Sequence, residues 1–115
     1  PKFITTEKPI VNGDGNTARD FTFVQDVAEA ISKCLSIDKP CNELLNIGSG
    51  NKTTLNELLT ILNKKEVAIY ETERPGDVKE SWADISYSKK VIGYEPKFTI
   101  EKGLEITKAY YESLK

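Results

Sequence analysis

Loops that carry glycine divide this sequence into short apolar runs and longer amphipathic runs. Gly13 and Gly15 follow the short β-branched run 9–12, and Gly48 and Gly50 follow residues 43–47. Short runs rich in β-branched or apolar residues predict strands, and apolar residues spaced three and four apart predict helices. Because the two kinds of run alternate, the sequence predicts an α/β fold with a small mixed sheet and flanking helices.

The individual elements follow from periodicity and from end signals. Strands are predicted at residues 9–12, 21–24, 43–47 and 67–70. A first helix opens at Asp26, and its apolar face comprises Val27, Ala28, Ala30, Ile31, Cys34 and Leu35. Further helices are predicted at residues 55–63 behind a Thr54–Glu57 capping box, from an Asp84 cap to Gly93, and from a Thr99 cap onward.

Composition and charge exclude several classes of protein. The 115 residues suit one domain, residues 1–115, or half of a two-lobed enzyme, and the net charge is −2. No run of Lys or Arg exceeds two residues, so we expect no nucleic-acid partner. No apolar run is long enough to cross a bilayer, so we expect no membrane span.

Histidine is absent, which removes the commonest general base and metal ligand. Cys34 and Cys41 stand without a second pair, so we expect no metal site and reduced thiols, as in a cytoplasmic protein. The chain begins at Pro1 without a methionine and runs into a strand-like segment, which we interpret as a piece of a longer chain.

Arg19 is the one cation in residues 13–30, a window that also holds Asp14, Asp20, Asp26 and Glu29. One interpretation is a solvated surface ion pair, which contributes little. The other is that Arg19 faces an anion from outside the chain, with the neighbouring acids holding its guanidinium in place.

The loop after residues 43–47 is a second candidate for an anion site. Gly48 and Gly50 follow a predicted strand and precede a helix N-terminus, where phosphates bind. Glu71 lies about twenty residues further on, as in a dinucleotide fold, and the stretch also resembles the loop of methyltransferases. Thr53 stands where a third glycine is needed, so a tight turn into a capped helix is the favoured interpretation.

The loop Arg74-Pro75-Gly76-Asp77 is the third candidate. Pro and Gly together predict a turn. A guanidinium binds phosphate oxygens in a bidentate manner, and a carboxylate accepts hydrogen bonds from vicinal hydroxyls, so the pair suits a polyol phosphate. A solvated turn is the alternative for this loop taken alone.

Four segments occur in an order that resembles a known family: PIVNGDGNTARDFTFVQDVAEA, NIGSGNKTTLNELL, RPGDVKESWADISYSKKVIGYEPK and EKGLEITKAYYESL. Together they are similar to the C-terminal substrate-binding part of nucleotide-sugar epimerases of the extended short-chain dehydrogenase/reductase family. The resemblance implies that Arg19 and Arg74 hold a diphosphate, that Asp77 binds the ribose, and that Asn46 lies near the substrate. It also implies that Ile10, Val11 and Asn12 lie along the base.

The family's N-terminal lobe is missing from this sequence. In the family that lobe carries the glycine-rich NAD loop, the catalytic Ser or Thr and a Tyr-x-x-x-Lys motif, and it forms the homodimer. The resemblance therefore implies NAD in the intact enzyme, no cofactor and no catalytic residue on this chain, and no turnover by the chain alone. The family also has a longer stretch between Ile4 and Pro9, so residues are expected to be missing there.

The implied function is the UDP-sugar-binding part of an NAD-dependent 4-epimerase of the UDP-glucose or UDP-N-acetylglucosamine type. The dehydratases of the family often have His at the position of Asp77, which favours an epimerase. A nucleotide-sugar dehydratase and a non-catalytic nucleotide-binding module remain as alternatives, and a methyltransferase-like cofactor domain is a weaker one.

Overall fold

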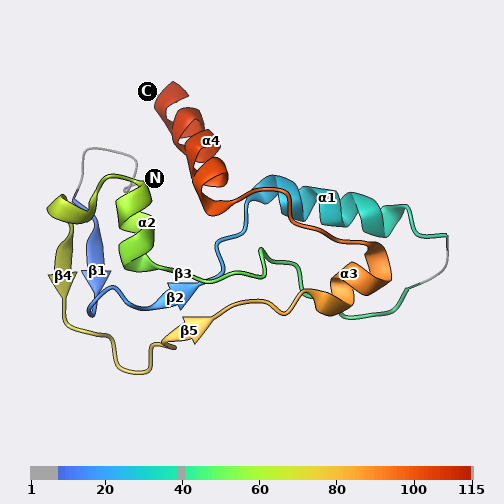
Figure 1. Ribbon diagram of the computed structural model, residues 1–115, viewed down its shortest axis with the longest axis horizontal. Helices are drawn as coiled ribbons and strands as arrows, with labels where there is room; N and C mark the ends of the chain where they lie inside the picture. The colour runs from blue at the N-terminus through green and yellow to red at the C-terminus, as the bar shows by residue number, and fades with distance from the viewer. Residues whose placement is uncertain (1–7, 39–40, 115) are drawn as a thin grey trace.

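The computed structural model describes residues 8–38 and 41–114. Strands and helices follow one another along the chain (Figure 1), as the sequence predicts for an α/β fold. The elements are β1 (Ile10–Asn12), β2 (Ala18–Arg19), α1 (Val24–Leu35), β3 (Thr53–Thr54), α2 (Leu55–Ile61), the 3-10 helix η1 (Lys65–Val67), β4 (Ile69–Glu71), β5 (Glu80–Ser81), α3 (Ser86–Ile92) and α4 (Ile100–Ser113). The strand-like opening segment and the interval after Ile4 lie largely outside the described residues.

The strands form two small sheets. β1 and β4 pair in parallel, with Val11 opposite Tyr70. β2 lies between β3 and β5, antiparallel to β3 and parallel to β5 (Figure 1). The fold is therefore a mixed α/β arrangement in which β2, the strand that carries Arg19, has a neighbour on each side.

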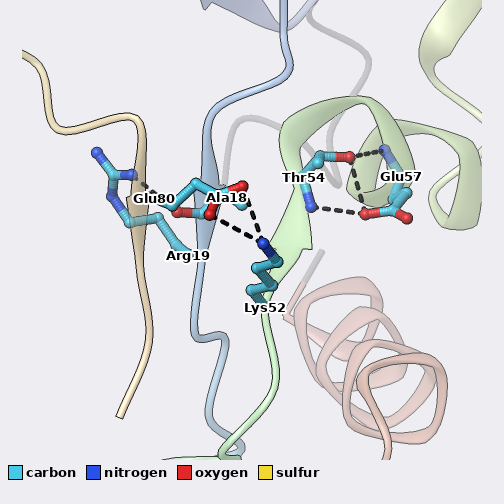
Figure 2. Close-up of polar contacts among 6 residues, drawn as sticks. All are labelled: Ala18, Arg19, Lys52, Thr54, Glu57 and Glu80. Atoms are coloured by element: carbon cyan, nitrogen blue, oxygen red, sulfur yellow. Dashed lines mark hydrogen bonds and ion pairs between the residues drawn. The ribbon is translucent and has the colours of Figure 1, made fainter.

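The predicted N-terminal caps of α2 and α4 and the predicted stop of α3 at Gly93 are confirmed, but the predicted Asp84 cap of α3 is wrong, because the N-cap residue is Ile85 and Asp84 accepts from the Ser86 amide one position earlier. The Thr54 hydroxyl accepts a hydrogen bond from the Glu57 amide at 3.1 Å, and the Glu57 carboxylate accepts one from the Thr54 amide at 2.7 Å (Figure 2). Thr99 caps α4 through the Lys102 amide, and Gly93 ends α3 with a φ of 64°. These end signals depend on residues close in sequence, which is why the sequence predicts them well.

Two predicted strands are wrong. Residues 21–24 do not form a strand, because the pairing partner, β5, meets the chain earlier: the Ala18 amide donates to Lys79 and the Asp20 amide donates to Ser81. Residues 43–47 contain no strand either, and Leu44 is 93% exposed. Within the described part of the chain no strand pairs with that segment, so it belongs to neither sheet.

Helix α1 begins at Val24, two residues before the predicted start. Its inner face holds Ala30, which packs with Ile92 and Tyr94, and the carboxylate of Asp26, which is 1% exposed. That carboxylate accepts hydrogen bonds from the Lys97 and Phe98 amides at 2.8 and 3.3 Å, and so ties α1 to the segment before α4.

The opposite face of α1 is apolar and open to solvent. Val24, Ile31 and Leu35 lie along it, although the sequence predicts Ile31 and Leu35 for the buried face. The molecule is also flat, measuring 51 × 36 × 17 Å, and its radius of gyration is 16.6 Å, against about 13 Å for a compact domain of this length. The protein thus has one thin layer of elements and little room for a central core.

The loop between β1 and β2 is closely packed, which leads to a first prediction. A Cβ at Gly15 would lie 2.3 Å from Asn56 Oδ1, and Gly15 has a φ of 77°. Gly76 has a φ of 84° but no atom within 4 Å of such a Cβ. Gly15→Ala should therefore lower the free energy of unfolding by about 2–4 kcal/mol, and Gly76→Ala by about 1 kcal/mol, measured by urea denaturation. Equal losses would contradict the packing at Gly15.

Candidate functional site

Arg19 lies on the central strand of the three-stranded sheet, opposite Thr53 on one side and Ser81 on the other. The side chain is half-buried, and its Nη1 donates to the carbonyl oxygen of Ala18 at 2.8 Å. In Figure 2 the guanidinium lies next to the backbone of β5 and a dashed line joins it to Ala18 of its own strand, whereas Lys52 forms an ion pair with Glu80 at 2.9 Å. In the described part of the chain no carboxylate forms an ion pair with Arg19.

The acids around Arg19 bind other groups. Asp14 accepts from the amide and side chain of Asn16, Asp26 binds the backbone before α4, and Glu29 pairs with Lys97 at 2.8 Å. The prediction that these acids hold the guanidinium in place is therefore wrong. The reason is that each of them satisfies a nearer donor within its own loop, helix or packing contact.

The Arg74–Asp77 loop forms the predicted turn. The Asp77 amide donates to the Arg74 carbonyl at 3.2 Å, and the φ of 84° at Gly76 after a proline is typical of a type II turn. All four residues are exposed, and the loop leads from β4 into β5 (Figure 1). Because β5 pairs with β2, the tertiary structure brings the strand after this loop beside the strand that carries Arg19.

The residues expected along the base lie on β1. Val11 is 3% exposed and belongs to the core, whereas Ile10 is 53% exposed and shares the opposite face with Asn12. Asn46 uses its side-chain amide to donate to the Asp84 carbonyl at 3.3 Å. Ile10 is thus exposed and Asn12 partly exposed, whereas Val11 and Asn46 have structural contacts.

The Gly48–Gly50 loop already holds an anion, and that anion is the carboxylate of Asp20. The amides of Ser49 and Gly50 donate to Asp20 at 2.8 and 3.0 Å. A Cβ at Gly48 would lie 2.6 Å from Asp20 Oδ2, so glycine is required for this approach. The favoured interpretation of a tight turn agrees with this geometry, because the Ser49 and Gly50 amides, which in a phosphate-binding loop would face the ligand, donate to Asp20.

Sequence reasoning missed Asp20 and Tyr94 as residues that shape the site. Tyr94 is 1% exposed, and its hydroxyl donates to the Gly48 carbonyl at 2.7 Å. Burial, together with the negative charges of Asp26 and Asp20, raises the pKa of Tyr94 above its ordinary value of 10.0. The only signal for Asp20 in the sequence is its position beside Arg19, because its partners lie about thirty and sixty residues away.

Two further features concern the described residues alone. They contain no cluster of three His, Cys, Asp or Glu side chains that could hold a metal ion. None of the helices in this part of the chain is both long enough and apolar enough to span a bilayer.

Comparison with known proteins places the chain in a family. Residues 3–107 match the family described as GDP-mannose 4,6-dehydratase. The chain belongs to this family. One similar protein is UDP-glucuronate 4-epimerase of Thermodesulfobacterium geofontis. It is 42% identical over 113 residues, which cover 92% of this chain and 34% of that protein.

Solved structures agree with this membership. UDP-glucose 4-epimerase of Thermotoga maritima, solved with UDP-glucose, matches with a TM-score of 0.86 and 33% identity over 98% of this chain and 37% of its own. UDP-glucuronic acid 4-epimerase of Bacillus cereus, solved with UDP-glucuronic acid and NAD, matches with a TM-score of 0.83 and 28% identity over 95% and 36%. The chain therefore spans about a third of the length of the family members it matches.

The buried hydroxyl of Tyr94 gives a second prediction. Tyr94→Phe removes a hydrogen bond and leaves the Gly48 carbonyl without its donor, so the free energy of unfolding should fall by about 1–2 kcal/mol. Tyr110→Phe, on the exposed side of α4, is the matched control and should change it by less than about 0.5 kcal/mol.

The pH dependence of stability checks the same contact. Since the pKa of Tyr94 is higher in the folded chain than in the unfolded one, its protonated form adds stability below the ordinary value of 10.0, which is lost as the pH rises above it. The wild-type protein should therefore lose more stability than Tyr94→Phe between neutral pH and strongly alkaline pH. If the free energy of unfolding falls equally with pH in both proteins, the raised pKa of Tyr94 is contradicted.

Proposed function

We propose that this chain is the nucleotide-sugar-binding part of an NAD-dependent 4-epimerase that acts on a UDP-sugar. The observation that carries the proposal is that the half-buried Arg19 side chain forms no ion pair with a carboxylate among the described residues. Arg19 lies on a sheet beside the strand that leaves the Arg74–Asp77 loop. A half-buried cation without an internal counter-charge is suited to an anion supplied by a ligand.

A nucleotide diphosphate matches this arrangement chemically. It carries about two negative charges, and two guanidiniums neutralise them through bidentate hydrogen bonds. Asp77 would accept hydrogen bonds from the ribose hydroxyls, and the exposed face of β1 with Ile10 and Asn12 would contact the base. The Arg74 side chain is exposed in a surface turn, and by this proposal it turns toward the phosphate that Arg19 binds.

The choice of a 4-epimerase is supported by the relatives and by Asp77. Proteins similar to this chain are named as UDP-glucuronate and UDP-glucose 4-epimerases. Because this chain corresponds to about a third of those proteins, the remaining part would bind NAD, which accepts and returns the hydride at C4 of the sugar. By this proposal the chain alone binds the nucleotide part and catalyses no turnover.

Removing either arginine from the full-length protein tests the proposal. Arg19→Ala and Arg74→Ala should each weaken UDP binding about ten- to a hundredfold, because each loses hydrogen bonds to a charged group worth roughly 1.5–3 kcal/mol. Lysine at either position should restore part of the affinity, since a point charge does not reproduce the guanidinium fork. Asp77→Asn should weaken UDP binding less than either arginine-to-alanine substitution does. Isothermal titration calorimetry with UDP measures these affinities.

Lys108→Ala provides the control, because it removes a cation from the exposed side of α4. Its affinity for UDP should equal that of the wild type. If Arg19→Ala binds UDP as tightly as the wild type does, Arg19 is a surface residue and the proposal is wrong.

We further propose that the rest of the enzyme covers the open face of this chain. Val24, Ile31 and Leu35 form an exposed apolar stripe on α1, Leu44 is exposed on the segment that follows α1, and exposed apolar groups of this kind mark docking faces. Residues 43–47 have a strand-like sequence but no strand partner among the described residues. A sheet edge of the N-terminal lobe would supply that partner.

Amide hydrogen exchange tests this docking. In the full-length protein, every second amide of residues 43–47 should exchange at least tenfold more slowly than in residues 1–115 alone, because alternate amides gain a ladder hydrogen bond to the new neighbour. The amides of Leu58 and Leu59, which are buried within α2, serve as the internal control and should be protected in both proteins. Equally fast exchange of residues 43–47 in both would rule out the docking.

A further inference from the structure

The carboxylate of Asp20 accepts hydrogen bonds from four donors in three separate segments. Oδ1 accepts from the Ser49 amide at 2.8 Å and from the Thr22 hydroxyl at 3.0 Å. Oδ2 accepts from the Gly50 amide at 3.0 Å and from the Ala83 amide at 3.2 Å. The proposed contacts to a nucleotide sugar give Asp20 no role.

These contacts join the parts of the chain that the proposed ligand site needs. Asp20 directly follows Arg19, and its own amide donates to the Ser81 carbonyl of β5 at 3.0 Å. Ala83 lies two residues beyond β5, the strand that the Arg74–Asp77 loop enters. One residue therefore fixes the end of β2 to the segment after β5 through both its backbone and its side chain.

The charge of Asp20 is satisfied by these donors. Burial alone raises the pKa of its carboxyl, but hydrogen bonds from Ser49, Ala83 and Thr22 outweigh burial, so the pKa lies below the ordinary value of 3.8. The carboxylate is thus an internal anion in a nest of backbone amides, a setting that elsewhere binds phosphate. Because this anion is bound by the backbone, it leaves the guanidinium of Arg19 without a counter-charge.

We propose that Asp20 is a positioning residue whose carboxylate fills the Ser49–Gly50 nest and thereby holds Arg19 and the chain leading from Asp77 in the register that binds a diphosphate. This inference rests on the proposed function, since it assigns Asp20 the task of placing groups that bind the nucleotide. Groups that bind a ligand must be held within about 0.5 Å of the geometry that binding requires, and the residues that support them provide this precision.

The test uses the full-length protein, UDP as the probe, and the variant Asp20→Ala with and without 100 mM formate. Asp20→Ala should weaken UDP binding about tenfold or more, the scale of one hydrogen bond to a charged group. Formate is a carboxylate small enough for the vacated nest and should restore at least half of the lost affinity. Formate should not change the UDP affinity of the wild type or of Arg19→Ala. Asp38→Ala, which removes an exposed carboxylate, should bind UDP with wild-type affinity.

The outcomes separate the two proposals. If Arg19→Ala weakens UDP binding and Asp20→Ala does not, Asp20 has no positioning role and the proposed function stands. Suppose that Asp20→Ala binds UDP weakly, that formate does not restore the affinity, and that the circular dichroism equals that of the wild type. Asp20 then does not act by filling the Ser49–Gly50 nest, and the inference is wrong. If Arg19→Ala has wild-type affinity, the proposed function and the inference both fail.

A second variant keeps the inference testable if Asp20→Ala does not fold. Asp20→Asn keeps one acceptor oxygen but turns an amide N–H toward the donors of the nest, so it should also weaken UDP binding, without a response to formate because the nest is filled. The loss in Asp20→Asn combined with Arg19→Ala should be smaller than the sum of the two single losses, since Asp20 acts partly through Arg19. Additive losses would overturn the inference.

Discussion

The hydrogen bonds to Asp20 hold this thin fold together at its centre. The sheet that contains β2 is made of strands two residues long, which have few ladder bonds of their own. Side-chain bonds from Asp20 to the loop at Gly50 and to Ala83 add the connections that such short strands lack. Asp26 does the same for α1 and the backbone before α4, so two buried or half-buried carboxylates replace part of a hydrophobic core.

A flat molecule of this kind has consequences for stability and for function. The buried apolar residues are few, and the cluster of Ala30, Ile92 and Tyr94 lies between α1 and α3 rather than between two full layers. The opposite side of α1 leaves Ile31 and Leu35 in water. By the docking proposed above, packing of another part of a larger protein on this side would remove the energetic cost of that exposure.

The distribution of charge is compatible with the proposed anion site even though the net charge of the chain is −2. The acids closest to Arg19 in sequence are occupied by backbone amides, by Asn16 or by Lys97, and Lys52 on the same sheet is neutralised by Glu80. Arg19 is left without such a partner in the described residues. Local pairing, rather than the total charge, therefore decides where an anion is attracted.

The sequence by itself determined the α/β class, the caps at Thr54 and Thr99, the stop at Gly93 and the turn before Asp77, because each depends on residues a few positions apart. The family membership also followed from short motifs. Tertiary structure alone decided that β2 forms at Ala18–Arg19, that residues 43–47 stay unpaired, and that the anion of the Gly50 loop is Asp20. These features depend on which distant segment supplies a hydrogen-bond partner, and strand pairing and burial are properties of two segments that local sequence patterns do not specify.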